Sequence, residues 1–555
     1  MSEPGANRSQ KLAWERAASE KYGNIDGYAG ATAAGIPIHT VYGPDNAATV
    51  DPDSIGYPGV FPYTRGIYPL QYQAVPWMNQ MVHGFGTPED TNERMRALLA
   101  QGMSGYGGRP VFNLVFDLPT QEGYDADDPV AGGRVGQSGV SVSTVDDMDR
   151  LFAGFDLAEI NASLIMADPS IAILGMYAVL AERRGVDIGR LRGNTMNFLY
   201  NTFHMDRHGF PPASAMRLIV DTIRFTSQNM PRWNSTNLCG YNIRQSGSNA
   251  AQELAYTIAT GITITEACVR DGLVPDDFLP RFGFQMCADN DFFEEIAKLR
   301  ALRRMWATIN GERFGAKDPA SLQARIHVHT SGASLTAQQP SVNIVRAALQ
   351  TLAAVLGGAN SIQTSAHDEA LSIPTEDAAI LALRTQQVIA HETGVAAVSD
   401  PLGGSYYLEW LTDQLVEAAS EILDDLERNG GGFMSAWETG WLREQIAAES
   451  YRDRERVDRG ERVIVGVNRF VTDQSSPTPV FTVSDEAELF QIGQLKSFRD
   501  RRDPIAAASS LKVLAEAVRD EAPLMPFVLE CFRSDSTLGE VMDVFRGAWG
   551  RGSIY

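Results

Sequence analysis

Residues 111–117 read Val-Phe-Asn-Leu-Val-Phe-Asp, and this run is the first of eight short strand-like stretches that alternate with helical patterns up to about Pro401. The other seven cover residues 162–167, 192–198, 236–241, 281–287, 325–330, 360–365 and 395–399, with amphipathic segments such as 214–229 and 291–306 between strands. This alternation is typical of βα units on a parallel sheet, and eight units predict an α/β fold with a closed (β/α)8 TIM barrel. A doubly wound open sheet is the alternative. It favours a glycine-rich phosphate turn after its first strand, but the sequence contains no Gly-x-Gly-x-x-Gly.

The predicted strands are unusually polar for a barrel, whose interior is ordinarily filled by Val, Ile and Leu. They carry small or hydrogen-bonding residues at Asn113, Ser163, Asn194, Thr195, Asn197, Ser235, Asn237, His327, His329, Thr330, Asn360, Gln363 and Ser365. Such side chains are costly when packed dry without partners. A position at a strand end, bonded to backbone, would account for any single one of them. Together they favour a channel that holds a long, partly polar ligand.

The sequence on either side of the barrel predicts two appendages. Residues 1–60, with scattered Gly, Pro and Asp and a helix-like start at 10–22, predict an extended N-terminal arm, and the barrel is expected within 61–405. Residues 406–555 predict a helical extension that contacts the barrel. Its features in chain order are a helix at 409–428, a break at Gly430-Gly-Gly432, another helix, a Ser/Thr/Pro-rich linker at 475–479 and two more helices ending near Trp549.

Composition and charge exclude several function classes. The 555 residues are 44% hydrophobic and 21% charged, which is typical of a globular protein. The net charge of −22 disfavours nucleic acids and anionic membranes as partners. Four scattered cysteines form no disulfide framework or Cys-x-x-Cys metal site, and no signal peptide or apolar stretch of about 20 residues is present. We therefore expect a cytoplasmic enzyme.

Several short motifs, in order along the chain, resemble those of a known family. They are Thr64-Arg-Gly-Ile-Tyr68, Gly84-Phe-Gly-Thr87, Phe116-Asp-Leu-Pro-Thr120, Asn229-Met-Pro-Arg-Trp-Asn-Ser235, Gly240-Tyr241, Ala297-Lys-Leu-Arg-Ala301, Thr330-Ser-Gly-Ala-Ser-Leu-Thr-Ala-Gln338 and Asp368-Glu-Ala370. With them, residues 57–468 resemble the methylmalonyl-CoA mutases and their relatives that act on isobutyryl-CoA and 2-hydroxyisobutyryl-CoA. The resemblance implies an adenosylcobalamin-dependent isomerase whose barrel threads an acyl-CoA along its axis beneath a cobalamin domain.

The chain lacks Asp-x-His-x-x-Gly, the motif that identifies this cobalamin domain. The nearest string, Asp206-Arg-His-Gly-Phe-Pro211, ends in proline and is expected in a barrel loop. Two-subunit family members carry the motif on a small partner. The resemblance therefore implies a large subunit, in a heterodimer or heterotetramer whose small cobalamin-binding subunit mainly holds the adenosylcobalamin. The extension at 406–555 is expected to contact this small subunit as well as the barrel. The resemblance leaves open whether a metallochaperone attends the complex.

The resemblance also implies roles for individual residues. Glu369 matches the glutamate that contacts the adenosyl ribose, although an exposed acid at a helix start is the alternative, and Tyr241 matches the tyrosine that walls the radical cavity. Contacts to the CoA and to the pocket are expected from Tyr68, Ser163, Arg281 and His327. Arg109, in a glycine-rich loop before the first expected strand, is a candidate for a further CoA contact.

Four residues depart from the family pattern in the acyl pocket, namely Val82, Val115, Met196 and Asn242. Asn242 replaces the histidine that bonds the thioester carbonyl, and it can donate a hydrogen bond but cannot act as an acid or base. Val82 replaces the aromatic residue that is tyrosine in methylmalonyl-CoA mutases, and Val115 replaces an aspartate of the hydroxyacyl enzymes. Met196 replaces the glutamine that binds a substrate carboxylate.

The arginine that would pair with a substrate carboxylate matches Asp206 or, with a shifted gap, Arg207. Burying a carboxylate without such partners is costly, so methylmalonyl-CoA is disfavoured unless Arg207 points inward. We therefore expect a radical 1,2-rearrangement of a branched, apolar acyl-CoA similar to isobutyryl-CoA. Methylmalonyl-CoA mutase, 2-hydroxyisobutyryl-CoA mutase and a barrel subunit without catalytic activity are the alternatives. A hydrolase or lyase barrel is disfavoured because the sequence lacks Gly-x-Ser-x-Gly and His-Glu-x-x-His motifs.

Overall fold

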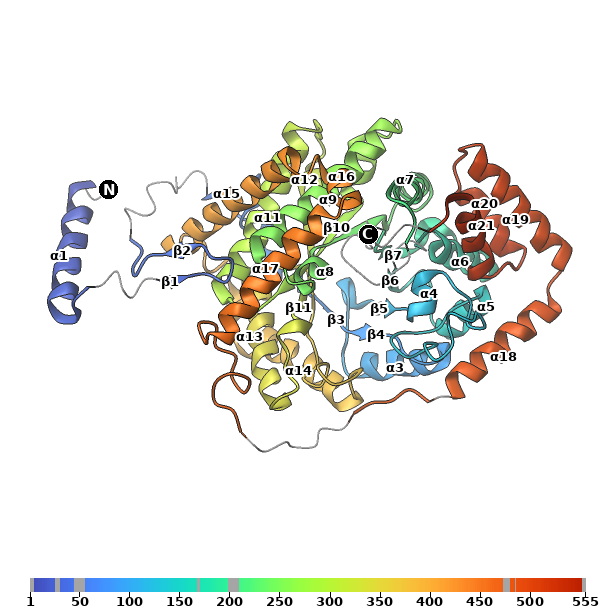
Figure 1. Ribbon diagram of the computed structural model, residues 1–555, viewed down its shortest axis with the longest axis horizontal. Coiled ribbons are helices and arrows are strands. Elements are labelled where there is room, and N and C mark those ends of the chain that lie inside the picture. Colours follow the sequence, from blue (N-terminus) through green and yellow to red (C-terminus); the bar gives the residue numbers. More distant parts are fainter. Residues whose placement is uncertain are drawn as a thin grey trace.

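The computed structural model describes residues 4–24, 30–43, 55–166, 170–197, 209–472, 480–484 and 486–551. Eight strand runs form its centre (Figure 1). Two of the runs are interrupted and carry two labels each, β3 (Met78–Gln80) with β4 (Val82–His83), and β8 (Trp233–Asn234) with β9 (Thr236–Cys239). The others are β5 (Val111–Val115), β6 (Asn161–Ile165), β7 (Arg192–Thr195), β10 (Phe282–Ala288), β11 (Arg325–Thr330) and β12 (Ser361–Gln363).

Strand pairing passes through these runs in chain order and returns to the first. β4 pairs with β5, followed by β6, β7 and β8, and β9 pairs with β10, followed by β11 and β12. β12 then pairs with β3, and all of these pairs are parallel. This is the strand order of a TIM barrel, so the predicted α/β fold class is confirmed.

One predicted strand was wrong and another was missed. Residues 395–399 form no strand; a short 3-10 helix, η10 (Val395–Ala397), follows Gly394 in a left-handed conformation (φ 71°). The first strand of the barrel is instead the run from Met78 to His83, which is polar, short and interrupted at Met81. The other seven predicted strands agree with the structure to within three residues at each end.

Alternate residues of the strands face two different environments. Apolar side chains such as Phe112 and Leu164 are fully buried in the core between strands and helices. The residues between them face the barrel axis and bond to one another across strands. Ser163 Oγ donates to Asn194 Oδ1 at 2.9 Å, and Asn237 Nδ2 donates to the same oxygen at 3.4 Å.

These side chains do not fill the interior. Val82, Val115, Ile165 and Asn194 share the axial face by strand register, yet all four are partly exposed. Because helices cover the outside of the strands, this exposure is toward space inside the barrel. A polar, accessible interior agrees with the lining predicted from the strand composition.

Helices surround the strands in the βα order. They are α3 (Pro88–Ala100), α5 (Val145–Leu151), α6 (Ser170–Arg183), α7 (Pro212–Asn229), α9 (Ala250–Arg270), α11 (Phe292–Glu312), α13 (Asn343–Leu356) and α14 (Glu376–Glu392). Capping boxes begin α3 at Thr87, α5 at Thr144 and α9 at Asn249, where the side chain accepts a backbone N–H of the first turn. Shorter helices lie at strand ends, among them α4 (Leu118–Glu122), α8 (Gly240–Gln245), α10 (Pro275–Phe278) and α12 (Pro319–Leu322).

The N-terminal arm consists of α1 (Pro4–Tyr22) and the antiparallel pair β1 (Gly30–Ala31) and β2 (Pro37–Ile38). Figure 1 shows α1 standing apart from the barrel. The pair is attached at the start of α11, where the Ala33 N–H donates to Asp291 at 2.9 Å. Just after β2, the Tyr42 ring packs on Trp410 with a centroid distance of 4.9 Å.

The C-terminal region contains more helices than predicted. α15 (Tyr406–Arg428), α16 (Phe433–Glu438) and α17 (Trp441–Asp458) follow the barrel, and then come α18 (Glu486–Arg501), α19 (Pro504–Arg519), α20 (Met525–Arg533) and α21 (Leu538–Trp549). The last four replace the two that were predicted, because Pro504 and Pro526 each start a new helix. The predicted linker at 475–479 lies outside the described residues.

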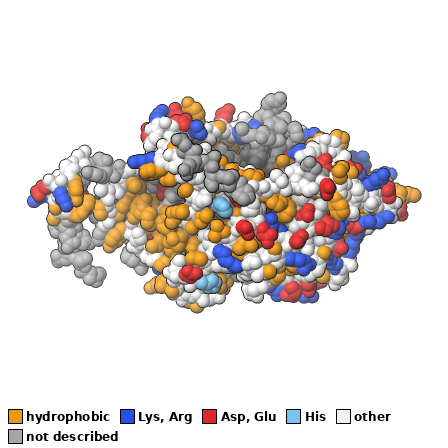
Figure 2. All heavy atoms as spheres, turned by 90° about the horizontal axis from the view of Figure 1, so that it is seen from below, with side chains coloured by type: hydrophobic (Ala, Val, Ile, Leu, Met, Phe, Trp, Pro, Cys, Tyr) orange, Lys and Arg blue, Asp and Glu red, His pale blue; other side chains and the backbone are white. Residues whose placement is uncertain are grey.

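α20 packs directly on barrel helix α6, where Gly175 permits the close approach. A Cβ added at Gly175 would lie only 2.9 Å from the Val528 side chain. Figure 2 shows charged side chains crowding the side of the molecule formed by the C-terminal helices and hydrophobic ones gathering toward the arm.

α11 contains three buried cations, Lys298, Arg300 and Arg303, and the first two belong to one of the family motifs. Lys298 is 0% exposed and contacts Glu253 at 2.5 Å as well as Glu295 and the Cys287 carbonyl. Glu253 in turn accepts the Cys287 N–H at 2.8 Å. The cluster therefore joins α9 and α11 to the carboxyl end of β10.

Arg300 forms a second buried cluster on the other side of α11. Its guanidinium contacts Asp400 at 2.8 Å and Glu409 at 2.5 Å, and Asp400 also accepts from Arg65 at 2.6 Å. Residues from the segment before the barrel and from α15 thus meet at one helix.

Replacing Lys298 by methionine should strongly destabilise the fold. The change leaves Glu253 and Glu295 buried without their cation, so we expect the free energy of unfolding to fall by about 3–5 kcal/mol. Urea unfolding followed by tryptophan fluorescence would measure it. Arg454→Met is the matched control, because its pair with Asp458 is exposed and should contribute less than about 1 kcal/mol. Equal losses in both variants would contradict the structural role of the cluster.

Candidate active site

Tyr241 and Asn242 lie at the carboxyl end of β9, in the first turn of α8. Gly240 makes this turn tight, since a Cβ there would come within 2.6 Å of Thr257 Oγ1. The Tyr241 ring stacks on His329, with a centroid distance of 4.3 Å and an interplanar angle of 17°. The Asn242 side chain is buried and bonds to none of the described residues.

Glu369 lies at the same end of the barrel, in the loop after β12. Its Oε1 accepts the Ala366 N–H at 2.7 Å, and burial raises its pKa to about 7. Burial also raises the pKa of Tyr241 well above its usual value, and the nearby carboxyl of Glu369 contributes to that rise. The neighbouring acid, Asp368, accepts from the Thr375 backbone at 3.0 Å before α14. The structure therefore brings Glu369 and Tyr241 together and leaves Asp368 in a structural role.

Three predicted pocket residues form an apolar group near the carboxyl ends of β4, β5 and β7. Val82 and Val115 face the axis and are partly exposed, whereas Met196, directly after β7, is 2% exposed. Arg207 and Asp206, the alternatives for a carboxylate partner, lie outside the described residues. No described basic side chain accompanies these three in the cross-strand register of β4 to β7.

Ser163 and His327 lie in the middle of the barrel. The Ser163 hydroxyl and the Asn237 amide both donate to the side-chain oxygen of Asn194. His327 Nδ1 bonds Ser361 Oγ at 2.8 Å, and its Nε2 is buried without a partner among the described residues. Burial lowers the pKa of His327 to about 4, so the ring is neutral near pH 7.

Tyr68 and Arg281 lie at the opposite, amino end of the strands. Tyr68 borders a small hollow with Trp77 and Asn360, beside the starts of β3 and β12. Arg281 immediately precedes β10, and its pKa is lowered by burial and by Arg325 and Arg192.

Further arginines gather at this end. The pKa of Arg192, which begins β7, is lowered by burial and by Arg232 and Arg109. Mutual depression of this kind requires cations close to one another. The amino end of the barrel is therefore locally positive in a chain of net charge −22. Arg109 pairs with Glu159 at 2.7 Å, so a ligand that contacts Arg109 would also meet this carboxylate. Arg192 and Arg325 were not among the predicted site residues, although each begins a predicted strand.

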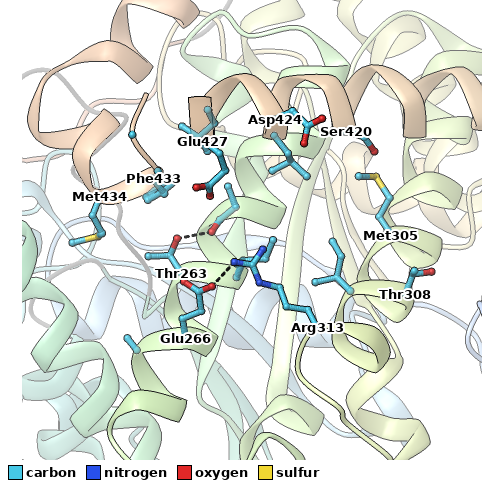
Figure 3. Close-up of a pocket in the computed structure, with 18 of the residues that line it drawn as sticks. Thr263, Glu266, Met305, Thr308, Arg313, Ser420, Asp424, Glu427, Phe433 and Met434 are labelled. Atoms are coloured by element: carbon cyan, nitrogen blue, oxygen red, sulfur yellow. Dashed lines mark hydrogen bonds and ion pairs between the residues drawn. The ribbon is translucent and has the colours of Figure 1, made fainter. Parts of the chain in front are cut away.

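The cavity shown in Figure 3 lies elsewhere, outside the barrel between α9, α11, α15 and α16. It measures about 1030 Å³, and Glu266 pairs with Arg313 at its wall. None of the predicted site residues lines it. The accessible hydrogen-bonding side chains on the barrel axis locate the candidate site better than cavity size does.

The described residues contain neither a membrane-spanning helix nor a metal-binding cluster. None of their helices is long and apolar enough to cross a membrane. Nor do these residues gather three or more His, Cys, Asp and Glu side chains that could hold a metal ion.

Comparison with known proteins agrees with this geometry. The family model for methylmalonyl-CoA mutase matches residues 31–551. The chain is 40% identical to the 2-hydroxyisobutanoyl-CoA mutase large subunit of Aquincola tertiaricarbonis, over 94% of this chain and 92% of that one. It is 36% identical to methylmalonyl-CoA mutase of Escherichia coli K12 over 97% of this chain and 75% of that protein, and 35% identical to the human mitochondrial enzyme over 94% and 68%. The chain therefore belongs to the methylmalonyl-CoA mutase family.

Proposed function

We propose that this chain is the large subunit of an adenosylcobalamin-dependent mutase that rearranges the carbon skeleton of a branched acyl-CoA with an uncharged acyl group. The observation that supports this most is the order of polarity along the barrel axis. Arginines lie at the amino end, hydrogen-bonding side chains line the middle, and an apolar group lies at the carboxyl end, where Tyr241 also lies.

An acyl-CoA has the same order of chemistry along its length. Its phosphates match guanidinium groups such as that of Arg281, which bind phosphate through charge-assisted hydrogen bonds. The pantetheine amides would bond to side chains such as Ser163, Asn237 and His327. Its acyl group would then lie against Val82, Val115 and Met196.

The apolar group favours an uncharged acyl substituent. A carboxylate placed among Val82, Val115 and Met196 would lose its hydration without gaining a cation, which costs several kcal/mol. The relative from Aquincola tertiaricarbonis is named for a hydroxyacyl substrate and that from Escherichia coli for a dicarboxylic one. We therefore rank a hydroxyacyl ester as the second candidate, ahead of methylmalonyl-CoA.

The residues at the carboxyl end fit an adenosyl group held by a separate subunit. Glu369 offers a buried carboxyl to sugar hydroxyls, and in the same loop His367 Nδ1 is buried without a partner among the described residues. When bound, adenosylcobalamin would supply the radical that starts the rearrangement. This chain would bind and orient the acyl group and exclude water. The name "large subunit" of one relative supports a small cobalamin-binding partner for this chain.

Reconstitution tests the proposed reaction. The chain would be combined with its small subunit, adenosylcobalamin and separate esters, namely isobutyryl-CoA, 2-hydroxyisobutyryl-CoA and methylmalonyl-CoA, with products identified by mass spectrometry. We expect a rearranged product from an uncharged ester and a far slower reaction with methylmalonyl-CoA. Turnover that is fastest with methylmalonyl-CoA would contradict the uncharged pocket. The absence of any product, with the small subunit shown to bind, would contradict a catalytic role.

The substitution Arg281→Met should weaken the binding of every CoA ester to the same degree. Loss of one charge-assisted contact to the CoA should raise KM about tenfold or more with little change in kcat, because Arg281 lies at the far end of the barrel from the acyl group. Steady-state kinetics with two esters would show it. Arg270→Met, on the exposed part of α9, is the control and should leave KM unchanged. An effect of Arg281→Met that depends on the acyl group would contradict this placement.

Glu369→Gln should stabilise the protein at high pH only. The pKa of Glu369 in the folded protein, about 7, lies above its value of 4.5 when unfolded, so its ionisation costs stability as the pH rises through 7. Removing the charge should add about 3 kcal/mol at pH 8 and little at pH 4.5. Thermal unfolding at both pH values would measure this. The control is Glu392→Gln, at an exposed end of α14. A gain that does not depend on pH would refute the assigned cause.

A further inference from the structure

Gln245 is the last residue of α8, one helical turn after Tyr241. Residues four apart lie on the same face of a helix, so the two side chains point toward the same neighbouring elements. Gln245 is not one of the residues to which the family resemblance assigns a role. Its side chain is partly buried at the edge of a polar hollow, which Ala333 also borders.

The carboxamide of Gln245 joins α8 to the ends of two strands. Its Oε1 accepts the Ala333 N–H at 2.7 Å, and its Nε2 donates to Ser331 Oγ at 3.2 Å. Both partners belong to the loop after β11, and Ser331 is fully buried. Nε2 also lies 3.4 Å from Cys287 Sγ, at the end of β10. Both polar atoms of the amide are thus bonded within the protein.

Gly332, between the two loop partners of Gln245, is in contact with Tyr241. A Cβ added at Gly332 would lie 3.1 Å from the Tyr241 hydroxyl oxygen and 3.5 Å from Gln245 Oε1, so both side chains lie against this glycine. Burial raises the pKa of Tyr241, and a hydrogen bond from the Gly332 backbone opposes that rise. Tyr241 therefore meets a backbone N–H whose neighbours on either side are bonded to Gln245.

The same loop has anchors on its other side. The Ser331 N–H donates to the Ala288 carbonyl at 2.8 Å and to Gln350 Oε1 at 3.1 Å. These bonds attach the loop to β10 and α13, whereas those of Gln245 attach it to the helix that carries Tyr241. Removing the Gln245 amide should therefore leave the loop folded but loosen the contact between Gly332 and the Tyr241 hydroxyl.

We propose that Gln245 is a positioning residue that fixes the Tyr241 hydroxyl through the loop of residues 331–333. The Tyr241 ring is already held by its stack on His329, with centroids 4.3 Å apart. Gln245 adds a constraint at the hydroxyl end of the same side chain. This inference rests on the proposed function, in which Tyr241 lies at the end of the barrel that holds the acyl group. A displaced hydroxyl should slow the chemical step and leave CoA binding at the far end unchanged.

Hydrogen exchange in the chain alone tests the link to the loop without any cofactor. Gln245→Leu keeps the size of the side chain and removes both polar atoms. The Gly332 and Ala333 amides should then exchange about tenfold faster, as expected for one weakened hydrogen bond each. Gln245→Glu should keep their protection, because its carboxylate can accept both the Ala333 N–H and the Ser331 hydroxyl. Mass spectrometry with fragmentation of peptides from this loop would measure each amide.

Steady-state kinetics of the reconstituted enzyme tests the effect on Tyr241. We expect Gln245→Leu to lower kcat about tenfold and to change KM by less than about twofold, and Gln245→Glu to keep kcat within about threefold. Tyr241→Phe removes the hydroxyl but keeps the ring, so adding Gln245→Leu to it should lower kcat by no more than about twofold further. The matched control is Gln414→Leu, since this amide bonds to Glu417 on the exposed side of α15 and should not affect either measurement.

Several results would overturn the positioning role. Unchanged exchange of Ala333 in Gln245→Leu would exclude the link to the loop. Losses of kcat that multiply in the double variant, or that are equal in Gln245→Leu and Gln245→Glu, would show that Gln245 does not act through Tyr241. If Gln245→Leu fails to fold by circular dichroism, Tyr241→Phe decides, because it should speed the exchange of Gly332 and not of Ala333. A wild-type enzyme without turnover would overturn the proposed function, whereas the exchange results would still decide whether Gln245 holds the loop.

Discussion

Hydrogen-bonding side chains on the inside of a barrel must find partners, and this requirement governs how the whole chain is arranged. Most barrels avoid the problem by packing aliphatic residues there. This chain places Ser163, Asn194, Asn237 and His327 on the axis, where some bond to one another and some keep unbonded atoms. The large apolar residues lie instead on the outer face of the strands, where Phe112 and Leu164 belong to the core. The fold is thus stabilised from outside the barrel, and the inside remains available for a polar ligand.

Because the apolar core lies outside the strands, the ends of the strands need other interactions to hold them in place. Buried clusters of charged side chains supply these interactions. Lys298 is bonded to the Cys287 carbonyl, and Glu253 is bonded to the Cys287 N–H, so both hydrogen-bonding groups of one backbone position are held at the end of β10. Tyr241 and His329 stack beside this position. A charged cluster is weak support for stability in general, since desolvation offsets much of its attraction. Here the cluster of Lys298 and Glu253 holds the carboxyl end of β10 in place, and the candidate site lies beside this strand end.

The sequence predicted the structure correctly where a residue type is compatible with one environment only. It gave wrong predictions where the same residues are compatible with two conformations. The polar strand residues predicted an open, lined barrel because amides and imidazoles are rarely buried in a barrel unless they bond to something inside it. The strand predicted at 395–399 was wrong because Val-Ala-Ala-Val-Ser has the composition of a strand, whereas the left-handed Gly394 before it leads the chain into a 3-10 helix. The run from Met78 to His83 was missed for the opposite reason, since its strand character comes from pairing with β12 and β5 and not from its residues.

The same distinction applies to the candidate site. Motif matching could name Tyr241 and Glu369 but could not separate them from Lys298 and Arg300, which belong to equally recognisable motifs and prove to be structural. His329 carried a signal in its spacing of two from His327 on one strand, but spacing cannot show which nitrogen is protonated or what lies opposite. What lies opposite comes only from the structure, where the Tyr241 ring stacks on the His329 imidazole. The family motifs therefore include residues that hold the barrel together, whereas the axial side chains that the fold leaves without partners are the ones to which a ligand can bond.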